Sequence, residues 1–250
     1  MKVLSIGNSF SQDAQKWLSQ VAASAGEEIL AVNLYIGGCP LVRHWNNFVS
    51  QAADYDLEIN GVFERKISIN EALTLENWDV ITFQQASPYS GDYATYQPYL
   101  SYLHREVRKI CPEAKLFIHQ TWSYDIDCRL DGYDNFHRSQ FIMDKRSIDA
   151  YNQASQDTGM ALIPCGDVVR YLRKNLPEFD YPNGGMSINR DGFHLTLDYG
   201  RYAAAITWFA FLTGRDPRDV SFVPVVEDKA ADPQLLKKIG QAVYTVLHTI

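Results

Sequence analysis

Four short apolar segments, each followed by a turn and a segment with helical periodicity, constrain this fold more than any other feature. They are residues 3–6, 29–36, 78–83 and 115–119, and Met160–Pro164 is a fifth of the same kind. Short runs rich in Val, Ile and Leu are typical of strands that are buried on both faces. Strands that alternate with helices predict a parallel sheet with helices on both faces. We therefore expect an α/β fold, a three-layer α/β/α sandwich around a central, mostly parallel five-stranded sheet.

Residues 55–69 depart from this alternation. Tyr55–Ile59 and Val62–Ile69 are strand-like, and they flank Asn60-Gly61, a dipeptide typical of two-residue hairpin turns. We expect a small β-hairpin insertion at the edge of the domain. No repeat, linker or low-complexity tract divides the chain, so the sequence predicts a single domain over residues 1–250.

The composition excludes several classes of function. A formal net charge of -7 argues against a nucleic-acid-binding protein, which usually carries a basic face. The sequence has no run of about 18 apolar residues, the length that could span a membrane. The scattered cysteines lack zinc-ligand spacing, so we expect reduced thiols, no metal and no cofactor. Lys2 leads straight into strand residues, which predicts a cytoplasmic chain as given, or a secreted or periplasmic one if a leader has been removed.

Ser9 is a candidate nucleophile. It follows the first apolar segment and Gly7-Asn8, which places it where a first strand meets a first helix. Ligands bind at this edge of open α/β sheets, and helix N-termini favour developing negative charge. The alternative is a helix cap, because Ser9-Phe-Ser-Gln12 has the spacing of a capping box. Ser11 could cap the same helix and leave Ser9 free.

His194 is the histidine with the most informative surroundings. Asp191 lies three residues before it, on a short turn with a glycine, so that its carboxylate could hold the imidazole in one tautomer. The alternative is an ordinary turn followed by a surface histidine. Acyl transfer by serine needs such a base and its orienting carboxylate, together with donors for the oxyanion.

Taken together, these segments resemble the SGNH (GDSL-like) hydrolases over nearly the whole chain. Gly7-Asn8-Ser9-Phe10-Ser11 is similar to the first block of that superfamily, Gly38 to the glycine of the second block, and Asp191-x-x-His194 to the last block. The resemblance implies a flavodoxin-like SGNH fold and a Ser9, Asp191, His194 triad. It further implies that the N–H groups of Ser9 and Gly38 bind the oxyanion. Gly-Gly-Cys-Pro-Leu-x-x-His and Gln-Gln-x-Ser resemble an uncharacterised bacterial SGNH-like subgroup associated with carbohydrate degradation.

The third block departs from the superfamily pattern. Gly-x-Asn-Asp is usual there, with the asparagine as an oxyanion donor, and this chain has Gln84-Gln85-Ala86-Ser87. A glutamine amide can donate a hydrogen bond, so we expect Gln85 to replace the asparagine. Gln84 and Ser87 are the competing candidates.

The expected function is a serine esterase that removes a short acyl group, an acetyl group, from a carbohydrate. Aromatic and polar side chains near the expected site suit a sugar ring, and we take His44, Gln84, Ser87, Trp122 and Tyr124 as substrate-binding candidates. The partner is then a small-molecule or oligosaccharide ester, with no nucleic acid or membrane; the oligomeric state stays open. Two alternatives remain: an esterase or thioesterase for small lipid or metabolite esters, and a non-catalytic carbohydrate-binding domain on the same fold.

Overall fold

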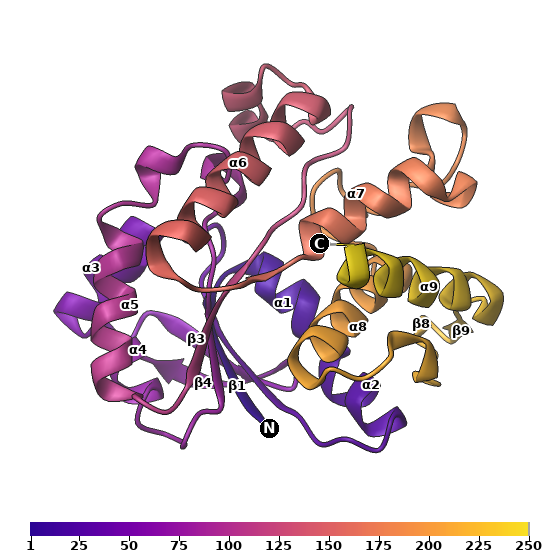
Figure 1. Ribbon diagram of the computed structural model, residues 1–250. Helices are drawn as coiled ribbons and strands as arrows, with labels where there is room; N and C mark the ends of the chain where they lie inside the picture. The colour runs from indigo at the N-terminus through magenta and orange to yellow at the C-terminus, as the bar shows by residue number, and fades with distance from the viewer. Residues whose placement is uncertain (250) are drawn as a thin grey trace.

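The protein folds around one sheet that lies between two layers of helices (Figure 1). The computed structural model describes residues 1–249. The sheet has the strand order β4-β3-β2-β1-β5-β6-β7. β1 lies at its centre and pairs in parallel with β2 and β5. The strands are β1 (Lys2–Gly7), β2 (Leu30–Tyr35), β3 (Tyr55–Ile59), β4 (Val62–Ile67), β5 (Val80–Phe83), β6 (Lys115–His119) and β7 (Leu162–Ile163).

The hairpin joins this sheet, which therefore has seven strands instead of the five expected. β3 pairs antiparallel with β2, and β4 pairs antiparallel with β3, so β4 forms one edge. Asn60 and Gly61 both have positive φ, 51° and 76°, as the tight turn of a two-residue hairpin requires. The other five strands, β1, β2, β5, β6 and β7, are the parallel strands that the sequence predicts. Their runs of apolar residues are buried because helices cover both faces of the sheet.

Helices cover both faces of the sheet. α3 (Leu41–Ser50), α4 (Ile69–Ala72), α5 (Tyr99–Ile110) and α6 (Gln140–Thr158) contribute to the core on one face. The opposite face carries α1 (Ser9–Gln15), α2 (Leu18–Ser24), α7 (Cys165–Asn175), α8 (Tyr199–Thr213) and α9 (Pro233–Thr249). The helical periodicity after Ser11 predicts one amphipathic helix that ends at Gly26, but the chain breaks at Lys16–Trp17 into α1 and α2. A short separate hairpin, β8 (Val225–Val226) and β9 (Lys229–Ala230), precedes α9.

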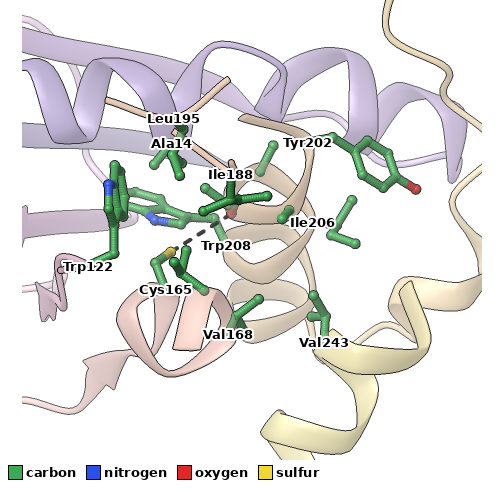
Figure 2. Packing of buried hydrophobic residues seen from close by; sticks show 14 of the residues in the cluster. Ala14, Trp122, Cys165, Val168, Ile188, Leu195, Tyr202, Ile206, Trp208 and Val243 are labelled. Carbon is green, nitrogen blue, oxygen red and sulfur yellow. Dashed lines mark hydrogen bonds between the residues drawn. The ribbon is translucent and has the colours of Figure 1, made fainter. Parts of the chain in front are cut away.

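α8 is the central element of the hydrophobic core on the face that also carries α1, α2, α7 and α9. Its residues 202–210 are all buried, so the helix is apolar on every side (Figure 2). Trp208 packs there beside Cys165, whose thiol lies 4.0 Å from the Ala204 carbonyl. Burial raises the pKa of the Cys165 thiol, which keeps it protonated. All four cysteines are free thiols.

The long segment between β6 and α6 is folded onto the core. Trp122, Tyr124, Tyr133 and Phe136 are each at most 1% exposed, and a 3-10 turn spans Asp131–Phe136. These aromatic side chains supply the burial that keeps a connection of this length ordered. Among the described helices, none has the length and apolar character needed to cross a bilayer.

Candidate active site

Ser9 is the first residue of α1, directly after the carboxyl end of β1. Asn8 is the N-cap: its side chain accepts the Phe10 N–H at 3.0 Å. The Ser11 hydroxyl accepts the Asn8 N–H at 3.1 Å and completes a capping box. The expectation that Ser9 is the N-cap is therefore wrong, and Ser11 contributes to the cap as the N3 residue of the box, not as the N-cap itself. Because Asn8 is the N-cap, the Ser9 hydroxyl is not needed to cap the helix. It forms no hydrogen bond with any residue in the range 1–249.

Gly7 allows the chain to turn this tightly. A Cβ at Gly7 would lie 2.1 Å from Ser11 Oγ, closer than any real Cβ contact. Ser11 itself is fully buried and lies 2.7 Å from Asn33 Oδ1 of β2. The glycine before Asn8 and Ser9 is thus required by close packing of the first turn of α1 against the sheet.

Asp191 holds His194 by both its backbone and its ring. One carboxylate oxygen accepts the His194 N–H at 2.8 Å, and the other lies 2.8 Å from His194 Nδ1. Burial raises the pKa of Asp191, but the hydrogen bonds from His194 and the Phe193 N–H together bring that pKa below its ordinary value. An ionised carboxylate at Nδ1 fixes the tautomer in which Nε2 is an acceptor. Nε2 is buried and has no hydrogen-bond partner within residues 1–249.

Asp13 ties this turn to α1. It lies one helical turn after Ser9, is completely buried, and accepts the Leu195 N–H at 2.9 Å. Arg190 Nη1 and Arg201 Nε approach the same carboxylate at 3.0 and 2.7 Å. Arg190 and Leu195 flank the Asp191–His194 turn, and the Arg190 N–H also donates to the His194 carbonyl at 2.8 Å. The carboxylate therefore fixes both sides of the turn to the helix that begins with Ser9.

Asp13 is a site residue that the sequence pattern does not reveal. Its only local signal is an acidic residue four positions after Ser9, which equally suits an exposed helix face. Phe10 lies on the same helix, and its ring centre is 6.1 Å from that of His194. No hydrogen bond joins the Ser9 hydroxyl to His194 Nε2 within residues 1–249; catalytic contacts of this kind often tighten only when substrate binds.

Two backbone N–H groups are available as oxyanion donors. Ser9 occupies the first helical position, where an N–H has no intrahelical acceptor. Gly38 lies in a turn closed by the Cys39 N–H and the Ile36 carbonyl at 3.2 Å, and its φ of 61° suits glycine. The Gly38 N–H has no hydrogen-bond partner in the described part of the chain. Asn8 Nδ2 donates to the Cys39 carbonyl at 3.2 Å, which joins this turn to the start of α1.

Gln85 does not have the place that the sequence predicts for an oxyanion donor. Its Oε1 accepts the N–H groups of Leu41 and Ala86 at 3.0 and 2.8 Å. Its Nε2 lies 3.1 Å from both the carbonyl and the hydroxyl oxygen of Thr95. The amide is therefore fully used in joining the start of α3 to the loop after β5, and this expectation needs correction. Ser87 is also engaged, 2.7 Å from the Tyr124 hydroxyl.

Gln84 instead joins three strand ends. Its Oε1 lies 2.6 Å from His119 Nδ1, and its Nε2 donates to Asn8 Oδ1. Burial lowers the pKa of His119 to about 3, so the ring is neutral and donates from Nδ1. The chain His119–Gln84–Asn8 thus reaches from β6 through β5 to the N-cap of α1. Gln84 positions Asn8, which is adjacent to Ser9.

All five expected substrate contacts are buried, Gln84 and Ser87 in the hydrogen bonds given above and the other three as follows. His44 is fully buried, with Nδ1 2.9 Å from the Tyr55 hydroxyl, and burial lowers its pKa to about 3. Trp122 stacks on Phe10 at 4.4 Å and donates to the Phe193 carbonyl at 2.8 Å. Tyr124 is 0% exposed. The hydrophobic effect, which removes large aromatic rings from water, explains why these side chains support the site from behind instead of lining it.

Comparison with known proteins agrees with the fold. No curated protein matches the chain. A DUF4886 family protein from Bacteroides uniformis has 35% identical residues and a TM-score of 0.90, over 100% of this chain and 95% of that one. An acetyl xylan esterase, AlAXEase, is similar over 84% of this chain and 99% of its own, at 14% identity and a TM-score of 0.54. A lipase/acylhydrolase from Enterococcus faecalis is similar over 86% and 96%, at 13% identity and a TM-score of 0.55.

The last two likenesses show the α/β/α fold, and a putative SGNH hydrolase from Slackia heliotrinireducens shares that fold over 83% of this chain and 96% of its own, at 21% identity and a TM-score of 0.55. The family described as a domain of unknown function, DUF4886, matches residues 2–241, nearly the whole chain. With that match and the likeness to the Bacteroides protein, the chain belongs to the DUF4886 family, within the SGNH hydrolase fold.

Proposed function

We propose that this protein is a serine esterase that removes a short acyl group, an acetyl group, from a carbohydrate. The observation that carries the proposal is the Asp191–His194 pair at 2.8 Å, with a buried Nε2 that has no partner within residues 1–249. Asp13 fastens this pair to the helix that presents Ser9. A base oriented by a carboxylate beside an uncommitted serine is the arrangement that nucleophilic acyl transfer needs.

The proposed reaction has two steps. His194 Nε2 takes the Ser9 proton as Ser9 Oγ attacks the ester carbonyl, and Asp191 stabilises the imidazolium. The N–H groups of Ser9 and Gly38 bind the oxyanion, and His194 gives its proton to the departing alkoxide. Water then attacks the acyl-enzyme with His194 as the base, and the carboxylic acid leaves as Ser9 regains its proton.

A fluorophosphonate probe, with the modified residue mapped by mass spectrometry, tests this proposal. We expect an adduct on Ser9 in the wild-type protein and no adduct in Ser9→Ala. Ser11→Ala is the matched control, because Ser11 is two positions away and engaged with Asn33. Labelling of another residue, or wild-type turnover of p-nitrophenyl acetate by Ser9→Ala, would contradict the assignment.

The acyl chain length and the alcohol need a separate measurement. Buried His44, Trp122 and Tyr124 no longer support a sugar site, so the carbohydrate half of the proposal depends on polar groups elsewhere at the same edge of the sheet. Both an acetyl xylan esterase and a lipase/acylhydrolase share this fold, so the fold does not select between sugar and lipid esters. A panel of p-nitrophenyl acetate, butyrate and octanoate, with acetylated xylo-oligosaccharides, separates them. Preference for octanoate would favour a lipid esterase.

A further inference from the structure

A cavity of about 200 Å³ lies behind the Asp191–His194 turn, in a part of the molecule that the proposed reaction does not use. Its walls come from the loop after β6, the first turns of α6, the second half of α7 and the 3-10 turn Tyr181–Asn183. α6 and α7 both lie in the upper part of the molecule, at the end of the sheet where α1 begins (Figure 1). The cavity is smaller than the roughly 300–1,000 Å³ of sites that enclose a drug-sized ligand, and it suits a single ring.

The charged groups of this cavity balance. Arg170, Arg173 and Lys174 of α7 face Asp125, Asp144 and Asp180. Arg173 Nη2 pairs with Asp125 at 2.8 Å, and Arg170 Nη2 pairs with Asp167 at 2.7 Å. Lys174 is exposed and has no ion pair within residues 1–249. A wall with equal numbers of cations and carboxylates gives little net attraction to an anion, but it offers donors and acceptors side by side.

Asp144 is the acceptor most available to a ligand. It lies on α6, one turn after Gln140, and it is only partly exposed. Burial raises the pKa of its carboxyl group, and Ser123, Arg173 and Arg170 oppose that rise. A half-buried acceptor of this kind gains from a donor that a ligand brings.

The cavity is joined directly to the catalytic turn. The Asp125 N–H donates to the Gly192 carbonyl at 2.7 Å, and Gly192 lies between Asp191 and His194. The Asp125 carboxylate accepts from Ser187 at 2.5 Å and from Asn189 at 3.2 Å. One wall of the cavity therefore supports the turn that holds the base.

We propose that this cavity is a subsite for a neutral sugar ring, the neighbour of the residue whose ester is hydrolysed. Each sugar hydroxyl both donates and accepts, so it can bond a carboxylate such as Asp144 and a guanidinium such as Arg170 together. The exposed ring of Tyr181 and the exposed Ile126 side chain offer apolar surface to the C–H face of a pyranose. The proposal rests on the proposed esterase function for its biological meaning, but binding at the subsite does not depend on turnover.

Binding of xylotetraose, cellotetraose and N-acetylated chitotetraose, three neutral sugars without an ester, to Ser9→Ala, measured by calorimetry, tests the subsite without any chemistry. We expect one of the three to bind, and the double variants Ser9→Ala/Asp144→Asn and Ser9→Ala/Lys174→Gln to bind about 10-fold more weakly. Lys174 is exposed, so its variant keeps the test valid if Asp144→Asn does not fold. Arg215→Gln, at the exposed pair with Glu27, is the matched control.

Kinetics then separates the subsite from the esterase proposal. For Asp144→Asn in the wild-type background, we expect the ratio of kcat/KM on acetylated xylotetraose to that on p-nitrophenyl acetate to fall about 10-fold. Tetraose binding without turnover of any ester would leave the subsite standing and remove the esterase. Ester turnover with no tetraose binding and an unchanged ratio would overturn the subsite. Tighter binding of tetragalacturonate than of all three neutral tetraoses would overturn its neutral character.

Discussion

Asp13 and Leu195 are joined by a hydrogen bond that spans 182 residues: the Leu195 N–H donates to Asp13 Oδ2 at 2.9 Å. The bond connects the helix of the candidate nucleophile to the turn of the candidate base. Because Arg190 and Arg201 also contact this carboxylate, its charge is compensated although it is fully buried. A third residue thus joins the helix of the candidate nucleophile to the turn of the candidate base.

Asp13→Asn should lower both stability and turnover. The substitution leaves Arg190 and Arg201 without a carboxylate, and breaking a buried ion pair costs about 3–5 kcal/mol. We expect urea unfolding to show a loss of that order, and kcat to fall by more than KM changes. Glu27→Gln, which removes the acid of an exposed pair with Arg215, is the control and should alter neither quantity. An Asp13→Asn variant with normal kcat would show that Asp13 does not position the turn.

Ser9→Ala should affect turnover, whereas Ser11→Ala should affect stability. Ser9 is the proposed nucleophile, so its loss should abolish ester turnover. Because Ser9 caps nothing, its loss should leave the free energy of unfolding nearly unchanged. Ser11 belongs to the capping box and contacts Asn33, so its loss should reduce stability by about 0.5–2 kcal/mol. Urea unfolding and p-nitrophenyl acetate hydrolysis of both variants measure this. Equal destabilisation by the two substitutions would mean that Ser9 has a structural role.

Asp191→Asn should reduce kcat by about four orders of magnitude, the loss seen when the equivalent change leaves a triad histidine in the wrong tautomer. An Asn side chain keeps an acceptor for the His194 N–H, so the turn itself should persist. The pKa of Asp191 lies below its ordinary value, so its carboxylate stays ionised until that lower pKa is passed. The acidic loss of activity in the wild-type protein should therefore not be due to Asp191. Steady-state kinetics from pH 4 to 9 measures both points, and a near-normal Asp191→Asn enzyme would exclude the triad.

Gln85→Ala should affect stability more than catalysis. It would leave the buried N–H groups of Leu41 and Ala86 without their acceptor, which costs about 1–3 kcal/mol for each group. Loss of an oxyanion donor would instead reduce kcat by about 10²–10³. We expect less than a 10-fold change in kcat, measured beside Gln241→Ala on the exposed face of α9. A loss of 10² or more, in a variant that remains folded, would restore Gln85 to the oxyanion site.

His119→Gln should weaken the loss of stability in acid. The pKa of His119 is about 3 in the folded protein against an ordinary 6.5, so between these pH values only the unfolded chain takes up the proton. Stability contributed by the neutral ring is therefore present above pH 6.5 and falls with pH by about 1.4 kcal/mol per unit below it. Glutamine cannot titrate but can donate to Gln84. Urea unfolding from pH 4 to 7 should give a slope lower by about one proton, and an unchanged slope would show that His119 does not remain neutral.

The fold was predictable because its signals are local. The apolar runs of β1, β2, β5, β6 and β7 and the helical periodicities between them appear in the sequence, and the Asn60-Gly61 turn does too. The break between α1 and α2 was not, because Ala14 and Leu18 keep the helical spacing across it. Joining of the hairpin to β2 depends on pairing between Val32 and Ile59, which no local pattern records.

The candidate site likewise has some residues whose contacts could be predicted from local sequence and others whose contacts could not. Asp191 and His194 are neighbours in sequence, so their contact could be predicted from a spacing of three. The roles of Asp13, Gln84 and Gln85 depend on which backbone groups meet them in space. Trp122 and Tyr124 show the same limit, since an aromatic residue in a polar loop looks alike in sequence whether its ring faces a ligand or the core.

The contact of Asp13 with Arg190, Leu195 and Arg201 also sets when activity can arise. During synthesis the ribosome releases Ser9 and α1 long before the turn that carries His194, so the early chain holds a serine without its base. The proposed reactive centre has all of its Asp13 contacts only after α8 has docked, since Arg201 lies on that helix. Ester hydrolysis would then report on completed folding, and a nascent or truncated chain should remain chemically silent.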